Sequence, residues 1–409
     1  MLLLPSILTL VPHGAAPLAG FAGLCAAGLL AANPSSGFYA ALRTPAMILA
    51  ALILAGALSA TWSIDPGRSL MLDARLAGLF AAGLALAAAA GRIAAPRRLT
   101  LCLIGGTAIA VVLAASDMAS GGGLSQYVSA RAFGAPRLNQ IAVWLAVLLL
   151  PVCAILVTRR RFVLGLAVGL VAAVTVYAFE GTAAKAALTL SLPVAALFWL
   201  WRRTMARLAA VVSIAAILTA PLTLPRIVYI GGIFASADSF KSSAGHRLLI
   251  WSFAGDRIAE RPFLGWGLDA SRAIPGGKDE IRPGQTWLPL HPHDAALQVW
   301  LELGAPGAAL FAMLVGLLWW RLAEPTWPRL YAAAAAGSLA AALAIVFSAW
   351  GIWQEWWLGT LDLALFAVLV MARTANPIVT PPPDDDPAQA ASATPVSAPP
   401  PSRRGGGAA

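Results

Sequence analysis

Long apolar runs follow one another along most of this chain of 409 residues and leave few segments that would be stable facing water. A helix needs about 20 mainly apolar residues to cross a bilayer, or roughly 17–25 when tilt is allowed. Runs of this kind, the first of them short, are at residues 1–12, 15–32, 45–62, 72–90, 99–116, 138–158, 162–178, 186–201, 208–224, 297–320, 330–350 and 357–372. They predict an all-α membrane protein with about 12 transmembrane helices, unless the first two runs form one helix kinked around Pro12 and His13.

The overall composition excludes an ordinary soluble domain. Only 11% of the residues are charged and 59% are hydrophobic, whereas soluble domains have about 25% charged and roughly 45–50% apolar residues. The net charge of +10 does not indicate a nucleic-acid-binding protein, because the basic residues lie in short clusters between apolar runs. Cys25, Cys102 and Cys153 lie inside apolar runs and predict neither a disulfide framework nor a metal site. The N-terminus has no charged region before its apolar run, so we expect no removable signal peptide.

The Lys and Arg residues between the apolar runs predict the orientation of the chain, because connections rich in these residues remain in the cytoplasm. Alternate connections contain thirteen basic residues and a single acid, Glu324. The basic residues of this set are Arg43, Arg92, Arg97, Arg98, Arg159, Arg160, Arg161, Arg202, Arg203, Arg207, Arg321, Arg329 and Arg373. We therefore expect these connections and both termini in the cytoplasm, and the remaining connections on the outer face.

Two segments depart from the pattern of spans and short connections. Residues 374–409 contain nine prolines and a run of three aspartates, a composition that cannot bury a core, so we expect a disordered cytoplasmic tail. Residues 225–298 contain tryptophans, amphipathic stretches and turn signals, which predicts one large, partly helical outer loop with a function. The chain is thus divided into helices 1–9 (residues 1–224), this loop, helices 10–12 (residues 299–373, with helix 10 beginning near residue 297) and the tail.

The outer loop begins with a predicted amphipathic helix over Ser242–Arg261. Either Ser242 or Ser243 is suited to cap its N-terminus, and apolar residues recur at helical spacing along it. Arg247 and Trp251 are four residues apart and therefore share one face of this helix. A basic and an aromatic side chain would thus project together from the outer loop.

Two further motifs follow this helix. Residues Pro262–Leu268 form a predicted tight glycine turn that carries aromatic residues, and the polar segment from Gly276 to Pro283 is expected to be mobile. The sequence His291, Pro292, His293, Asp294 then leads directly into the helix Ala295–Trp320. Asp294 is expected to be the N-cap of that helix.

In this order and topology, the motifs resemble the O-antigen ligase and polymerase family over about residues 45–372. Members of that family typically have an Arg…Trp helix, a Pro…Gly-x-Gly turn, and a His-Asn-x-x-Leu…Glu-x-Gly-x-x-Gly entry into a membrane helix. The matching residues are Gly245, His246, Arg247 and Trp251; the run Arg261–Gly267; His293 to Gln298 with Glu302, Leu303, Gly304 and Gly307; and Trp62–Pro66. The chain departs from the family at Asp294, where Asn is commoner, and at residues 180–185, where the family often has Ser-x-Ser-Arg.

The resemblance implies a metal-independent membrane glycosyltransferase without a cofactor, located in the bacterial inner membrane with its active face in the periplasm. The implied donor is a glycan linked to polyprenyl (undecaprenyl) diphosphate, and the acceptor is a lipid A-core sugar or a growing glycan; no nucleic acid takes part. His293 is the expected catalytic base, and Arg247 is expected to hold the diphosphate through its planar pair of donors. Further candidates for substrate binding are Arg131, Arg137, Lys185, His291, Trp251 and Asp294.

Structural roles for several of these residues remain open alternatives. A histidine at a helix start is often only solvated, and basic residues near a membrane often snorkel or form surface ion pairs. The three tryptophans at positions 353, 356 and 357 are interpreted as an interfacial aromatic belt. Asp65 and Asp73 are interpreted as caps or as partners of Arg68 and Arg75. A metal site at the two histidines and Asp294 lacks clustered further ligands in the sequence.

Three other functions share parts of this pattern. A polymerase that joins O-antigen or exopolysaccharide repeat units has the same architecture and nearly the same motifs. A protein O-oligosaccharyltransferase fits less well. A secondary transporter or flippase would place charged or Gly/Pro-broken residues at mid-span in corresponding positions of two halves, whereas here the polar motifs are collected in one outer segment, which favours an enzyme.

Overall fold

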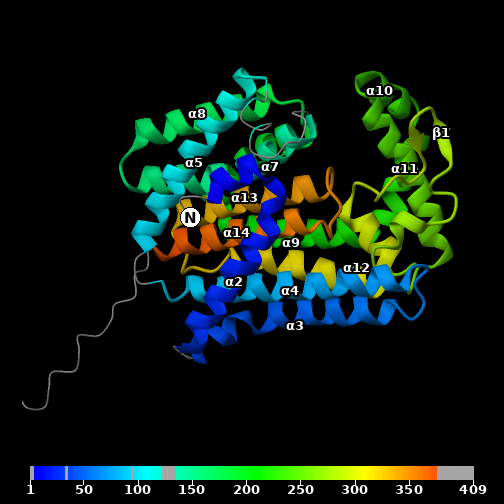
Figure 1. Ribbon diagram of the computed structural model, residues 1–409, viewed down its shortest axis with the longest axis horizontal. Coiled ribbons are helices and arrows are strands. Elements are labelled where there is room, and N and C mark those ends of the chain that lie inside the picture. Colours follow the sequence, from blue (N-terminus) through cyan, green and yellow to red (C-terminus); the bar gives the residue numbers. More distant parts are fainter. Residues whose placement is uncertain are drawn as a thin grey trace, which may run out of the picture.

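The computed structural model describes residues 4–32, 36–93, 96–121, 123, 127 and 135–374. Over these residues the chain is almost entirely helical, which confirms the predicted all-α class (Figure 1). The helices are α1 (Leu4–Leu10), η1 (Pro12–Gly14), α2 (Ala15–Ala32), α3 (Ser36–Ser59), α4 (Pro66–Ala90), α5 (Pro96–Ala119), α7 (Ala135–Thr158), α8 (Phe162–Ala178), α9 (Thr182–Thr223), η2 (Leu224–Tyr229), α10 (Ile233–Phe240), α11 (Ser242–Glu260), η3 (Ala270–Ala273), α12 (Ala295–Arg321), α13 (Arg329–Val346) and α14 (Glu355–Arg373). Two short antiparallel strands, β1 (Glu280–Arg282) and β2 (Gln285–Thr286), complete the described elements.

Nine helices in the described part of the chain are long and apolar enough to cross a membrane, so the expected count of 12 is not confirmed. α1 has only seven residues, and the candidate span nearest the N-terminus is Pro12–Ala32. The first expected run therefore does not form a span of its own. α8 has 17 residues and is an apolar helix shorter than these nine.

The two runs expected at residues 186–201 and 208–224 form two helices that are joined across a kink and together make up α9. Trp201 is the one residue in it with non-helical backbone angles (φ −132°, ψ 49°), and the helix is kinked there. Residues 202–207 contain neither Gly nor Pro and are mostly good helix formers, so no sequence signal ends the helix after the kink. Each half of α9 is still about as long as a bilayer-spanning helix.

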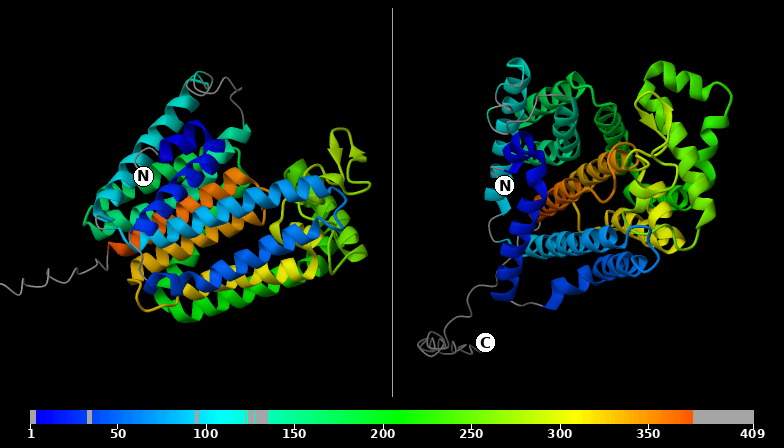
Figure 2. Two further views of the ribbon diagram at one scale, coloured as in Figure 1. Left: turned by 60° about the horizontal axis from the view of Figure 1, so that its bottom comes forward. Right: turned by 45° about the vertical axis from the view of Figure 1, so that its right-hand side comes forward.

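Several long helices, among them α3, α4 and α12, lie side by side along the long axis of the molecule, and the outer-loop elements gather at one end of it. Figures 1 and 2 show α3, α4 and α12 running lengthwise, with α10, α11 and β1 at the same end. α9 packs against both α12 and α13, α7 packs against α8 and α13, and α14 packs against α2 and α4. We call the end that carries residues 225–294 the loop end.

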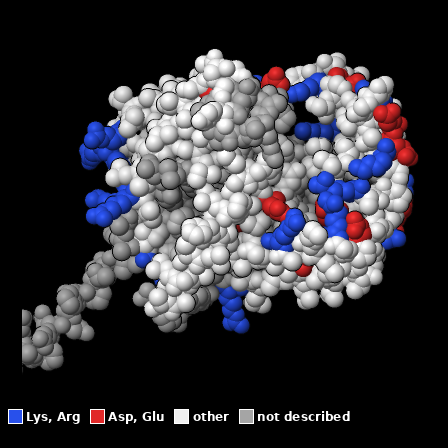
Figure 3. Space-filling model, viewed as in Figure 1, with Lys and Arg blue, Asp and Glu red and all other residues white. Residues whose placement is uncertain are grey.

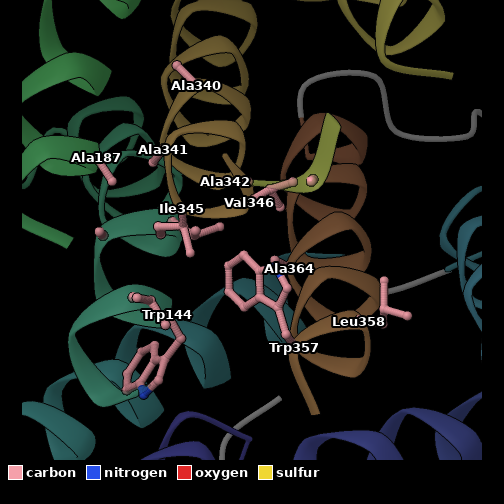
Figure 4. Close-up of a cluster of buried hydrophobic side chains, with 14 of the residues drawn as sticks. Trp144, Ala187, Ala340, Ala341, Ala342, Ile345, Val346, Trp357, Leu358 and Ala364 are labelled. Carbon is pink, nitrogen blue, oxygen red and sulfur yellow. The ribbon is translucent and has the colours of Figure 1, made fainter. Parts of the chain in front are cut away.

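The core lies where α7, α9, α13 and α14 meet. Trp144 of α7, Ile345 of α13 and Trp357 of α14 belong to one cluster of fully buried side chains (Figure 4). α13 contributes mainly alanines and Gly337, and a Cβ at that glycine would lie 2.3 Å from the Leu150 side chain and 2.8 Å from the Ser191 carbonyl oxygen. Small residues of this kind let membrane helices approach closely without a large side chain between them.

The interfacial belt expected from the C-terminal tryptophans is wrong. Trp353 and Trp356 are each 7% exposed and Trp357 is 0% exposed, so all three are core residues. The sequence shows that three large aromatic side chains lie near the start of a helix. It does not show whether their rings face the bilayer or another helix.

Charged side chains are distributed unevenly over the surface. On the face in Figure 3, Lys and Arg project from the left edge, most of the middle is uncharged, and basic and acidic residues are mixed over the right-hand part, which carries α10, α11 and β1. An uncharged middle between two charged ends is the pattern of a helical bundle whose long axis crosses a bilayer.

Candidate functional site

The site at the loop end is built on a break in α12. Gly304 has a left-handed φ of 62° and divides α12, and the preceding turn carries Gly265 (φ 67°) and Gly267 (φ 104°), which confirms the expected glycine turn. Backbone N–H groups of Trp266 and Gly267 donate to the Leu301 and Glu302 carbonyls, each at 2.9 Å. A Cβ at Gly265 would lie 2.5 Å from the Glu302 carbonyl oxygen, so the close approach of turn and helix requires glycine there.

Glu302 joins three separate segments at this break. Its carboxylate is fully buried and accepts four hydrogen bonds. The donors are the Asp269 N–H (2.7 Å) and Trp353 Nε1 (2.7 Å) to Oε2, and the Ser271 hydroxyl (2.5 Å) and Gln298 Nε2 (3.1 Å) to Oε1. The carboxylate therefore ties η3 and the loop between α13 and α14 to α12. An acidic residue within an apolar span is the sequence signal that marks Glu302 for such a role.

The histidine segment lies directly before α12 and is held from both sides. Asp294 Oδ1 accepts the Leu297 N–H at 2.9 Å, which confirms Asp294 as the N-cap. Trp251 of α11 donates from Nε1 to the Pro292 carbonyl at 3.1 Å, so the predicted α11 helix positions the segment. His293 itself has a left-handed backbone conformation (φ 59°).

Hydrogen bonds determine which nitrogens of the two histidines carry protons. His293 Nδ1 lies 2.7 Å from the Ala349 carbonyl, which can only accept, so Nδ1 is the protonated nitrogen and Nε2 has a free lone pair. His291 Nδ1 lies 3.1 Å from the His293 N–H and accepts from it, which places the His291 ring proton on Nε2. The two ring centroids are 4.3 Å apart. The pair therefore presents one acceptor, His293 Nε2, and one donor, His291 Nε2–H.

Burial and nearby positive charge keep both histidines neutral. Burial first, and then the positive charge of Arg247, lower the pKa of His293 to about 4, although its hydrogen bond to Ala349 acts in the opposite direction. Burial, His293, Arg272 and Arg247 lower the pKa of His291 to about 3. Burial also lowers the pKa of Arg247. Among the described residues, no carboxylate lies within ion-pair distance of Arg247, so this half-buried guanidinium has donors available for an anion.

A cavity of about 720 Å³ opens beside the histidines. His291 lines it, together with Gln298, Gln354 and the three arginines Arg68, Arg75 and Arg272. Neither His293 nor Arg247 is among the residues that line it. None of these three arginines is among the residues that the sequence predicts to bind substrate. Arg68 and Arg75 are seven residues apart on α4 and so share a helix face, which is the signal that would have grouped them.

The expected partners of these arginines are corrected by the structure. Asp65 caps α4 by accepting the Arg68 N–H at 3.2 Å, but the Arg68 guanidinium pairs with Asp269 at 2.5 Å. Arg75 pairs with Glu355 at 2.9 Å. Asp73 Oδ1 is buried and has no hydrogen-bond partner in the structure. Asp73 is therefore not the partner of Arg75.

The remaining sequence candidates lie away from the cavity or outside the described residues. Lys185 is half-buried near the start of α9 and does not line the cavity. Arg137 is in the first turn of α7, where side chains are not described, and Arg131 lies outside the described residues. The segment expected to be mobile, Gly276 to Pro283, contains β1, which pairs with β2 just beyond it. Lys241 rather than a serine occupies the N-cap of α11. No group of three or more His, Cys, Asp or Glu residues that could hold a metal ion is found in the described part of the chain.

Comparison with known proteins connects this site to one family. Residues 147–312, which include Arg247, both histidines and Glu302, match the family described as O-antigen ligase. A Rickettsia conorii protein is 49% identical over 77 residues, which are 18% of this chain and 19% of that protein. Proteins from Rickettsia felis and Rickettsia prowazekii are each 36% identical over 31% of this chain and 33% of their own length.

All three relatives carry names that begin "Putative polysaccharide ligase", and the aligned part is a third or less of the length of each. The family match covers the second half of the membrane bundle as far as the middle of α12, together with the whole outer loop. Over residues 147–312, the chain is thus similar to the O-antigen ligase family.

Proposed function

We propose that this protein transfers a glycan from a polyprenyl-diphosphate carrier to a hydroxyl group of a lipid A-core sugar, at the periplasmic face of the inner membrane. The observation that carries the proposal is the fixed arrangement at the start of α12. His293 Nε2 has a free lone pair because Nδ1 donates to Ala349, and Arg247 nearby has no carboxylate partner among the described residues. A neutral base beside an available cation is what transfer from a diphosphate leaving group requires.

The chemical steps follow from these two groups. His293 Nε2 accepts the proton of the acceptor hydroxyl while its oxygen attacks the anomeric carbon of the donor glycan. The bond from that carbon to the phosphate oxygen breaks, and its electron pair leaves with the diphosphate. Arg247 offers two parallel N–H donors to the phosphate oxygens, where negative charge increases during the step. We propose that the reaction needs neither a metal ion nor a cofactor, because the donor is already activated and arginines supply the positive charge.

The other site residues divide into two proposed groups. Arg68, Arg75 and Arg272 line the cavity and add positive charge for the donor phosphates, and Arg131, Arg137 and Lys185 remain proposed as further basic contacts. Trp251 and Asp294 act as positioning residues, because their polar atoms bond to the Pro292 carbonyl and to the Leu297 N–H. His291 lines the cavity, and its Nε2–H is proposed to donate to a substrate oxygen there.

The proposed orientation is supported by charge. The thirteen basic residues of the alternate connections favour a cytoplasmic location for the end opposite the loop end. In Figure 3, basic side chains without acidic neighbours project from the left edge, opposite α10 and α11. The site would then face the periplasm, where lipid-linked glycans are joined without a nucleotide.

A deletion strain distinguishes a ligase from a polymerase. Lipopolysaccharide gels of a strain lacking the protein should show bare lipid A-core while lipid-linked polymer accumulates, and the wild-type gene should restore the ladder. Core that carries a single repeat unit would instead assign the protein as a polymerase. An unchanged ladder would contradict both. The names of the matched relatives favour the ligase.

A further inference from the structure

Gln298 belongs to the motif that resembles the O-antigen ligase family, but the proposed reaction does not use it. It lies near the start of α12, five residues after His293, and is 3% exposed. A buried amide is costly unless its polar atoms have partners. Here Nε2 donates to Glu302 Oε1 at 3.1 Å, and Oε1 accepts the Ile352 backbone N–H at 3.0 Å. Gln298 therefore joins α12 to the connection between α13 and α14.

This connection, residues 347–354, carries the acceptor that fixes the proposed base. The Ala349 carbonyl lies 2.7 Å from His293 Nδ1 and accepts its proton. Among residues 350–353, Ile352 is the only one whose backbone N–H has a hydrogen bond within the described part of the chain. The backbone in the middle of the connection is thus attached to α12 through Gln298. Because Ile352 is only three residues from Ala349, a displacement at one is transmitted to the other.

Close packing leaves the connection little room to move. Gly351 is buried, and a Cβ at this position would lie 3.0 Å from Cδ2 of His291 and 3.3 Å from Gln298 Oε1. Both distances are shorter than ordinary van der Waals contact. The connection therefore contacts one histidine through Gly351 and the other through the Ala349 carbonyl, so its position affects both rings.

We propose that Gln298 is a positioning residue for the base His293. By fixing Ile352, Gln298 holds the Ala349 carbonyl at the place that keeps the ring proton on Nδ1 and leaves Nε2 free. This inference rests on the proposed function and adds a residue to the same site. Its physical reason is that neutral imidazole has two tautomers, and the hydrogen bond at one nitrogen determines which of them is present. A base that is oriented by a third group is a recurrent arrangement in enzymes.

Replacing Gln298 by methionine tests the proposal. Methionine is similar in length and favours helix formation, but it can bond neither the Ile352 N–H nor Glu302. The Ala349 carbonyl should then shift, and His293 should occupy both tautomers. We expect kcat to fall by about tenfold to a hundredfold, less than the 10²–10⁴-fold typical of removing a base, while KM stays near the wild-type value. A raised KM with unchanged kcat would instead assign Gln298 to substrate binding and overturn the proposal.

Three further variants separate positioning from a general loss of stability. Ser338→Ala removes a buried hydrogen bond to the Val147 carbonyl (2.7 Å) in the core and should leave kcat unchanged. Ser271→Ala removes another donor to Glu302 Oε1 but retains the Ile352 bond, so kcat should fall less than in Gln298→Met. Gly351→Ala pushes the connection away from His291 and should lower kcat although Gln298 is intact. Equal losses in Ser271→Ala and Gln298→Met, or normal kcat in Gly351→Ala, would overturn the proposal.

The tautomer of His293 can be measured without glycan transfer. The chain has four histidines, so 15N labelling of histidine alone gives few ring signals, and those of His293 are the ones lost in His293→Ala. Near neutral pH, wild type and Ser338→Ala should show a protonated Nδ1 and an unprotonated Nε2. Gln298→Met and Gly351→Ala should show averaged signals from both tautomers.

Wild-type signals of His293 in Gln298→Met would overturn the proposal, even if transfer by that variant is slow. Averaged signals in Gln298→Met, in a protein whose wild type transfers no glycan, would retain the positioning of His293 by Gln298 and refute the proposed function instead.

Discussion

Replacing Glu302 by glutamine tests whether one buried carboxylate holds the site together. Each carboxylate oxygen accepts two hydrogen bonds, from Asp269 and Trp353 on one side and from Ser271 and Gln298 on the other. Glutamine has the same shape but presents an NH2 group in place of one oxygen. It would therefore face two former donors whichever way the amide turns.

The magnitude follows from these contacts. The better orientation points the NH2 group at Ser271, whose hydroxyl can rotate to accept, and leaves the Gln298 amide opposed. Hydrogen bonds to a charged group contribute about 1.5–3 kcal/mol each, and an unsatisfied buried polar group costs about 1–3 kcal/mol. The neutral amide is cheaper to bury than the carboxylate, which offsets part of this loss. We expect Glu302→Gln to lower the free energy of unfolding by about 2–4 kcal/mol.

The assay is SDS titration of the purified protein in mixed micelles, followed by glycan transfer at a temperature where the variant is folded. Transfer should also fall, because the segments tied by Glu302 include Trp353 and Asp269 at the cavity wall. Glu324→Gln is the matched control, since Glu324 is 41% exposed in its ion pair with Arg321 and should contribute less than about 1 kcal/mol. Equal stability of the two variants would refute the view that the carboxylate organises the site.

Three further predictions concern the chemistry and the orientation. His293→Ala should lower transfer by about 10²–10⁴-fold, and Arg247→Lys should also be strongly impaired, because lysine retains the charge but not the planar fork. Both variants should show near-normal abundance on immunoblots. Turnover close to wild type in His293→Ala would remove the base from the mechanism. Because the base must be neutral and its pKa is lowered to about 4, kcat/KM should be constant from pH 8 to 5.5 and fall only near pH 4; a midpoint near 6.5 would contradict this pKa. Cysteine at Asp256, an exposed residue of α11, should react with an impermeant thiol reagent in outer-permeabilised cells while cysteine at Ala388 should not, and the reverse result would invert the topology.

The parts of the fold that the sequence predicts are those with local signals. α11, the glycine turn and the Asp294 cap each depend on a few neighbouring residues, and all three are found in the structure. The number of membrane-spanning helices is harder to predict from the sequence. Hydropathy measures whether a segment is apolar but not whether a helix continues through the next residues. α9 illustrates this limit, since its kink at Trp201 lacks a Gly or Pro signal.

The candidate site could be predicted only in part, because several of its contacts join distant segments. His293, Arg247 and their neighbours belong to short motifs, and the sequence predicts them as site residues for that reason. The four donors to Glu302 come from three separate parts of the chain. Arg68 and its ion-pair partner Asp269 are 201 residues apart in the sequence. Such pairings depend on how helices pack, which no local pattern records.

The low pKa of His293 has a consequence for the order of events. A base is most effective when its pKa lies near the working pH, and a histidine with a pKa of about 4 is neutral but weak. Part of that lowering comes from the charge of Arg247, and a bound diphosphate would bring negative charge beside that guanidinium and raise the pKa of His293 again. The donor would thus strengthen the base that deprotonates the acceptor. We therefore expect kcat to fall on the acid side at a higher pH than kcat/KM for the acceptor, when the latter is measured at low donor concentration. Identical acid limbs in the two pH profiles would show that the donor leaves the pKa of His293 unaffected.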